Sequence, residues 1–110
     1  MHVRYDHTVA TFRVGRAVGM GTVTRNDIHL IPQMVQAVHK MKVSVTHIPS
    51  QSTAEYAVFS ATFNSHMTVN AVDRLLRGVE QTKSGSRFTF SNPQIPPIGP
   101  RSIRRRQSAL

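Results

Sequence analysis

Residues 43–59, VSVTHIPSQSTAEYAVF, combine two β-type segments with a polar turn between them. Residues 43–48 are mostly β-branched, which favours a strand, and residues 49–53 have the Pro, Ser and Thr composition of a turn. Residues 55–63 form the clearest strand of the chain, because apolar side chains alternate onto one face: Ala57, Phe59, Ala61 and Phe63. The segment therefore predicts two neighbouring strands, with His47 as a packed imidazole or an imidazole at the edge of the sheet.

Apolar residues at helical spacing precede and follow this pair of strands. In the first predicted helix they are Ile28, Ile31, Val35 and Val38. In the second they are Val69, Val72, Leu76 and Val79. Pro32 is tolerated in a first turn, where the backbone N–H has no partner to lose, so we expect the first helix to begin near Ile28 or His29.

Further strands are predicted outside the two helices. Residues 8–25 suggest a strand, a turn loosened by glycines, and a second strand at 21–25. Residues 87–91 make a short last strand. The resulting order of strand, helix, strand, strand, helix, strand is the ferredoxin-like plan, an α+β fold with two helices on one face of a four-stranded antiparallel sheet.

The 110 residues are enough for one small domain with a single core. We expect three parts: an N-terminal arm or extra strand over residues 1–19, an α+β domain over 20–91, and an extended tail over 92–110. The tail shows no periodicity, its prolines favour an extended backbone, and arginines follow them.

Four short segments follow the pattern of one known family: Thr22-Val23-Thr24, residues 27–31 (DIHLI), residues 43–50 (VSVTHIPS) and Glu55-Tyr56. Through these segments, residues 20–90 resemble an ACT domain, most closely the regulatory domain of phenylalanine hydroxylase and of prephenate dehydratase.

The resemblance implies an ACT-like βαββαβ fold with an effector site for an aromatic amino acid, formed here by His29, Leu30 and Ser50. His29-Leu30-Ile31 replaces the family's Gly-Ala-Leu loop, and residues 49–52 (PSQS) replace its Glu-Ser-Arg-Pro turn. A histidine side chain occupies space that a glycine leaves open for a ligand. The resemblance therefore keeps the frame of the fold while the effector-site residues are altered.

The residue content argues against catalysis. The chain has no cysteine, which excludes disulfides and thiolate chemistry, and its six histidines include no H-x-x-x-H pair. Ser50, Ser52 and Ser60 lack the context of an activated nucleophile, and the glycines of residues 15–21 lack dinucleotide or P-loop spacing. No apolar run of 18 residues is present, so no membrane span is expected. We predict no enzyme activity, no cofactor and no metal site.

Charge is the strongest signal. The 14 Lys and Arg against 5 Asp and Glu give a net charge of +9, which attracts polyanions, nucleic acid first and anionic membrane second. Phe59, Phe63 and Phe88 are predicted to be core, and no basic-aromatic RNA-recognition signature is present, so we expect contacts to phosphates rather than to bases. The predicted RNA-binding residues are Arg4, Arg13, Arg16, Arg25, Arg74, Arg77, Arg87, Arg101, Arg104, Arg105 and Arg106.

The sequence therefore predicts a non-catalytic structural subunit of a ribonucleoprotein, specifically a mitochondrial ribosomal protein that contacts rRNA and neighbouring proteins. Its basic tail would neutralise phosphates without reading sequence. Two alternatives stay open: an ACT-type regulatory module that binds an aromatic amino acid, and an accessory subunit of a respiratory membrane complex. If the location is not mitochondrial, the expectation is cytoplasmic.

Overall fold

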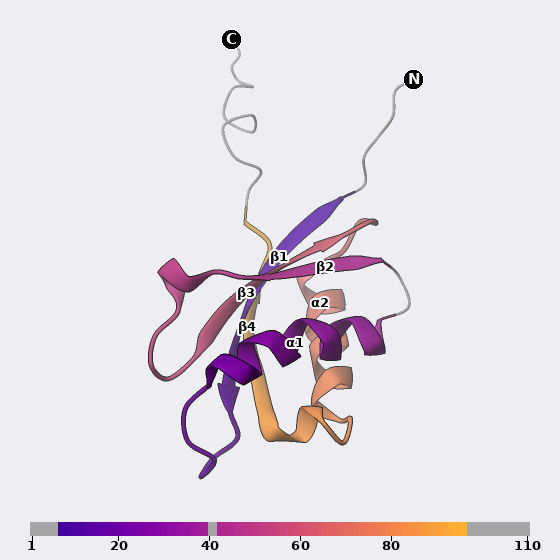
Figure 1. Cartoon of the computed structure of the whole chain (residues 1–110). Coiled ribbons are helices and arrows are strands. Elements are labelled where there is room, and N and C mark those ends of the chain that lie inside the picture. Colours follow the sequence, from indigo (N-terminus) through magenta and orange to yellow (C-terminus); the bar gives the residue numbers. More distant parts are fainter. Residues whose placement is uncertain (1–6, 40–41, 97–110) are drawn as a thin grey trace, which may run out of the picture.

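The computed structural model describes residues 7–39 and 42–96 and shows an α+β fold (Figure 1). Two α-helices, α1 (Arg25–Val38) and α2 (Val69–Glu80), cover one face of a four-stranded antiparallel sheet. The strands are β1 (Thr8–Arg16), β2 (Val43–His47), β3 (Ala57–Phe63) and β4 (Phe88–Gln94). Their order in the sheet is β2-β3-β1-β4. The α+β class, the four-stranded antiparallel sheet and the two helices are confirmed.

Short 3-10 turns precede the last two strands. These are η1 (Pro49–Gln51) before β3 and η2 (Gly85–Arg87) before β4. Neither α1 nor α2, the two helices of the described residues, is long and apolar enough to cross a membrane.

The N-terminal part of the fold differs from the prediction. The first strand, β1, is not an addition to the sheet, because it lies between β3 and β4. The strand predicted at 21–25 is wrong: the chain between β1 and α1 forms a loop in which Gly19 and Gly21 have φ angles of 85° and 87°. Residues 22–24, which the resemblance to an ACT domain would place in a strand, lie in this loop.

Helix α1 begins at Arg25, earlier than predicted, because Thr24 caps it. The side-chain oxygen of Thr24 accepts a hydrogen bond from the N–H of Asp27 at 3.2 Å. The Asp27 carboxylate accepts one from the N–H of Thr24 at 2.8 Å, which completes a capping box. Pro32 therefore lies inside the helix rather than in its first turn.

The hydrophobic core lies between the sheet and the two helices. Side chains alternate along a strand, and every second residue of β1 from Thr8 to Val14 and of β3 from Ala57 to Phe63 is buried. The predicted core residues Phe59, Phe63 and Phe88 are confirmed, with exposed fractions of 0%, 1% and 3%. The helices add Ile31, Met34 and Val35 from α1 and Val72, Leu76 and Val79 from α2.

The opposite face of the sheet carries no helix and is largely polar; we call it the open face. Thr11 of β1 pairs with Ser60 of β3, which pairs with Thr46 of β2. Arg13, two residues further along β1, pairs with Val58 of β3. All five phenylalanines of the chain are buried in the core, so the open face offers no phenylalanine on which a base could stack.

Strand β4 is longer than predicted and includes the first residues of the predicted tail. The strand continues to Gln94, with a register shift against β1 between Thr11 and Arg13. Asn92, at this shift, has a φ angle of 54°, which an asparagine tolerates better than most residues. Pro93 is tolerated because β4 is an edge strand. Residues 97–110 of the predicted tail lie outside the described residues.

Candidate nucleic-acid interface

The predicted RNA-binding arginines divide into two sets. Arg13, Arg16, Arg25, Arg74, Arg77 and Arg87 belong to the part of the chain that the structure describes. Arg4, Arg101, Arg104, Arg105 and Arg106 lie outside it, so their role stays a prediction.

Arg16 is engaged within the fold. Its guanidinium makes two hydrogen bonds to the Asp27 carboxylate, at 2.8 and 3.0 Å, and a third to the Met20 carbonyl at 3.2 Å. The exposed fractions of the Arg16 and Asp27 side chains are 21% and 5%. Burial would raise the pKa of the Asp27 carboxyl, but hydrogen bonds from Arg16 and Thr24 outweigh it and lower that pKa from its ordinary value. Arg16 therefore ties the end of β1 to the start of α1.

Arg13 lies on the open face and has a different environment. Its side chain makes no ion pair within the described residues, and its guanidinium lies over the ring of Tyr56, 4.5 Å from the ring centre. A guanidinium in a cation–π contact keeps N–H groups with which it can bind a ligand.

A cleft of about 240 Å³ adjoins Arg13, and we call it the Arg13 cleft. Its polar lining residues are Thr11, Arg13, Gln51, Tyr56, Asn92 and Gln94. They come from β1, η1, the residue before β3, and the distorted end of β4. No Asp or Glu lines this cleft, so its only formal charge is positive.

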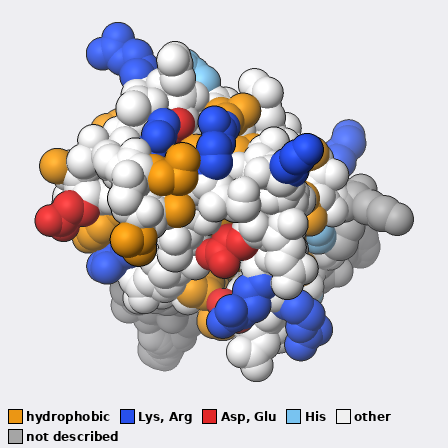
Figure 2. Space-filling view, turned by 90° about the horizontal axis from the view of Figure 1, so that it is seen from below, with side chains coloured by type: hydrophobic (Ala, Val, Ile, Leu, Met, Phe, Trp, Pro, Cys, Tyr) orange, Lys and Arg blue, Asp and Glu red, His pale blue; other side chains and the backbone are white. Residues whose placement is uncertain are grey.

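The other described arginines are spread over the molecule. Arg74 and Arg77 are exposed on α2, and Arg77 pairs with Asp73 at 2.9 Å. Arg25 is the exposed first residue of α1, and Arg87 ends η2. Figure 2 shows the end of the molecule that is lowest in Figure 1, with Lys and Arg side chains scattered over it and acidic side chains between them. On this face, the Lys and Arg side chains of the described residues do not form one continuous basic patch.

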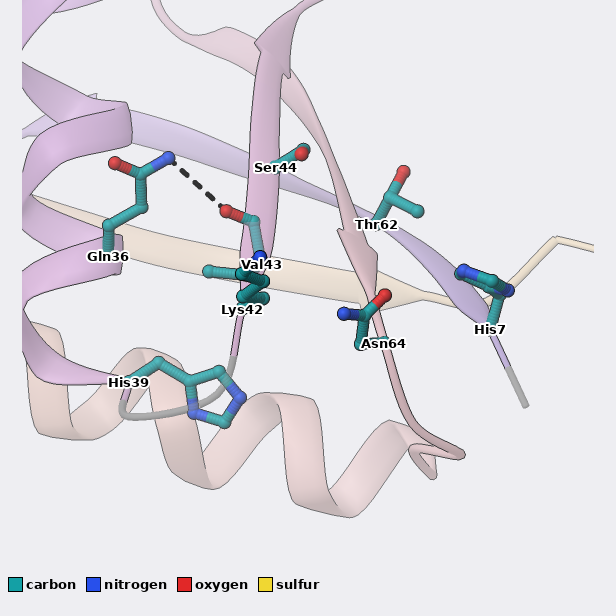
Figure 3. Close-up of a pocket in the computed structure, with 8 residues that line it drawn as sticks. All are labelled: His7, Gln36, His39, Lys42, Val43, Ser44, Thr62 and Asn64. Atoms are coloured by element: carbon teal, nitrogen blue, oxygen red, sulfur yellow. Dashed lines mark hydrogen bonds between the residues drawn. The ribbon is translucent and has the colours of Figure 1, made fainter. Parts of the chain in front are cut away.

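A larger pocket, of about 580 Å³, lies where β2 and β1 begin and β3 ends (Figure 3). We call it the histidine pocket, and its polar lining residues are His7, Gln36, His39, Lys42, Ser44, Thr62 and Asn64. The side-chain amide of Gln36 donates a hydrogen bond to the Val43 carbonyl at 3.2 Å. Three His, Asp or Glu side chains able to share a metal ion are not found together anywhere in residues 7–39 and 42–96.

His39, the residue after α1, is the unusual group of this pocket. Its ring meets Phe63 edge-on at 5.4 Å between ring centres. The Nε2 atom is buried and has no hydrogen-bond partner in the described part of the chain. Burial lowers the pKa of His39, which favours the neutral imidazole.

His47 has a structural role in the turn between β2 and β3. Its Nε2 lies 3.0 Å from Ser52 Oγ, and its ring packs 5.3 Å from that of Phe59. The hydroxyl of Ser52 donates its one proton to the Ile48 carbonyl at 2.9 Å and accepts from the Val58 N–H at 2.9 Å. With its proton directed at Ile48, the Ser52 hydroxyl offers His47 Nε2 an acceptor lone pair. His47 is thus packed against Phe59 and lies on an edge strand of the sheet, in agreement with the prediction of a packed or edge imidazole.

The residues predicted for an amino-acid effector site come from α1 and η1. His29 is exposed on α1, Leu30 packs partly against the core, and Ser50 is exposed in η1. None of the three lines the Arg13 cleft or the histidine pocket.

Sequence reasoning missed most residues of both cavities. The Arg13 cleft depends on Gln51, Tyr56, Asn92 and Gln94, which meet only through the register of the strands and the irregularity in β4. The one local signal is Asn92-Pro93, a pair that disfavours a regular strand.

Comparison of the chain with protein-family models, with curated proteins and with solved structures gave no match.

Proposed function

We propose that this protein is a non-catalytic, RNA-binding structural subunit of a ribonucleoprotein assembly, of which a mitochondrial ribosome is the most specific form. For the fold we propose the ferredoxin-like, ACT-like plan. The order of elements, with β1 and β3 central and β2 and β4 at the edges, is compatible with it.

The distribution of charge carries the functional proposal. The described residues contain eight Lys and Arg against four Asp and Glu, a net charge of +4, and the rest of the chain contains six against one, a net charge of +5. Two of the four described acids, Asp27 and Asp73, already pair with arginines. The remaining basic side chains therefore set the sign of the surface, and a polyanion is the partner that this charge attracts.

The spread of the arginines favours contact from several sides. Arg13 is on the open face, and Arg74 is on a helix that covers the other face. Arg25 is the first residue of α1, and Arg87 is the last residue of η2. A protein that reads one groove of a duplex needs its basic residues on one side. A subunit embedded among RNA segments contacts phosphates on several of its sides.

The test is the salt dependence of RNA binding, measured by fluorescence anisotropy with structured RNA. The full chain should lose affinity linearly on a log–log plot between about 50 and 200 mM salt. A chain ending at residue 96, which keeps all of β4, should still bind, with a slope smaller by up to about three because four arginines are removed. Absent or salt-independent binding by the full chain would reject the proposal.

A further inference from the structure

The Arg13 cleft is built almost entirely from groups that can donate hydrogen bonds. Gln51, Asn92 and Gln94 supply side-chain amides, Thr11 supplies a hydroxyl, and Arg13 supplies a guanidinium. A site with several donors, one fixed cation and no carboxylate is suited to an anion. A cationic or purely apolar ligand would leave those donors unpaired.

Arg13 is held ready for such a ligand. Long arginine side chains lose rotamer freedom when they bind, and stacking on Tyr56 removes part of that freedom in advance. The N–H groups at the edge of the guanidinium form a fork that fits two oxygens of a phosphate. Arg16, three positions along the same strand, is unsuited to this role because Asp27 already occupies its fork.

Two walls of the cleft are fixed by the backbone. On one side, the irregularity at Asn92 in β4 brings both Asn92 and Gln94 to the border of the cleft. On the other side, η1 carries Gln51, and Ser52 holds this turn through its bonds to Ile48 and Val58. The donors therefore do not depend on a flexible loop to come together.

From this geometry we infer that the Arg13 cleft binds a phosphate group of single-stranded RNA, with Arg13 as the charged contact and Gln51, Asn92 and Gln94 as neutral donors. The anion site stands on the cleft alone, whereas RNA as the source of the phosphate rests on the function proposed above. Every nucleotide carries the same phosphate, so binding at this cleft is insensitive to base sequence.

The first experiment titrates the ¹⁵N-labelled full chain with inorganic phosphate and follows side-chain NMR signals. The Arg13 Nε–H signal and the amide signals of Gln51 and Gln94 should shift with saturation, while sodium chloride at equal ionic strength should not reproduce the shifts. Equal responses to phosphate and chloride, or unchanged cleft signals, would overturn the anion site.

The second experiment measures binding of a short, unstructured oligouridylate to Arg13→Gln and to Arg74→Gln. Both changes remove one exposed positive charge, but Arg74 lies on α2, away from the cleft. Loss of a charged hydrogen-bond donor to phosphate should weaken binding about tenfold in Arg13→Gln, and loss of general attraction about twofold in Arg74→Gln. Circular dichroism checks that both variants are folded.

The outcomes separate this inference from the proposed function. Equal losses in the two variants would overturn the cleft as an RNA contact while general RNA binding stands. Cleft shifts with phosphate but no binding of oligouridylate or structured RNA would support the anion site and reject the RNA-binding function.

Discussion

Arg13 and Arg16 lie three residues apart on β1 and have opposite uses. Arg13 points to the open face, stacks on Tyr56 and makes no ion pair among the described residues. Arg16 lies on the side of the helices, where Asp27 at the start of α1 binds it with two hydrogen bonds. Because side chains of a strand alternate between faces, residues an odd number of positions apart meet different surroundings.

The comparison shows why arginines cannot be assigned to RNA from composition. Both residues belong to the same basic segment, and both raise the net charge equally. An arginine that pairs with a carboxylate from another helix or strand stabilises the fold. An arginine without such a partner can bind a ligand. For Arg16 that partner comes from α1, eleven residues further along the chain.

The largest expected effect comes from breaking the ion pair between Arg16 and Asp27. Asp27→Ala removes both the ion pair and one half of the capping box, and we expect the free energy of unfolding to fall by about 3 kcal/mol. Arg16→Gln should be less destabilising, because the hydrogen bonds between Asp27 and Thr24 remain. Denaturant unfolding measures both. The control Asp73→Ala breaks an exposed pair and should change stability little. Equal losses of stability in Asp27→Ala and Asp73→Ala would contradict the role of Asp27 in stabilising the fold.

The same pair predicts a response to acid. The pKa of Asp27 is lowered in the folded state, so the unfolded chain takes up this proton first as the pH falls. The stabilisation is present above about pH 4 and is lost as the pH falls through the lower pKa of the folded state. Arg16→Gln should flatten this loss of stability between about pH 5 and 2, and Arg13→Gln should not. If both variants lose stability in acid as the native chain does, Arg16 is not the residue that lowers the pKa of Asp27.

His39 provides a second pH window that neither arginine should affect. Burial lowers the pKa of His39 below its ordinary value of 6.5, so the unfolded state binds the proton first and stability falls as the pH drops below that value. His39→Phe keeps a ring against Phe63 and removes the buried Nε2 atom, which has no hydrogen-bond partner among the described residues. Unfolding at pH values from about 7 to 5 should show a weaker pH dependence in this variant. An unchanged pH dependence would mean that another group titrates there.

The smallest expected effect comes from removing the contact between Arg13 and Tyr56. Tyr56→Leu removes the ring that holds the guanidinium, and the affinity for oligouridylate should fall about twofold to fivefold. Tyr56→Phe keeps a ring and should bind nearly as well as the native chain. A loss of the same size in both variants would assign the effect to the hydroxyl of Tyr56 rather than to stacking.

Regular segments of this fold could be predicted from the sequence, whereas its irregular segments could not. The strand ending at Phe63 and the second helix have strong periodicity and were predicted closely, because one apolar face decides each. The start of α1 was wrong because the capping pair of Thr24 and Asp27 outweighs the tendency to place Pro32 in the first turn.

The candidate site was predicted only in part, for a related reason. Arg13 could be named from charge, but its neighbours in the cleft could not. Gln51 and Gln94 reach it through strand pairing and the register shift at Asn92, which no local pattern specifies. Arg16 was named for the same charge, and its partner Asp27 was treated only as part of the resemblance to an ACT domain.

The most direct measurement is the salt dependence of RNA binding for Arg13→Gln and Arg16→Gln, each at a temperature where it is fully folded. The slope of log K against log salt concentration should be smaller by about 0.7 in Arg13→Gln, because one phosphate contact is lost, and unchanged in Arg16→Gln. Equal reductions in both variants, or no reduction in Arg13→Gln, would contradict the division of these two arginines between binding and folding.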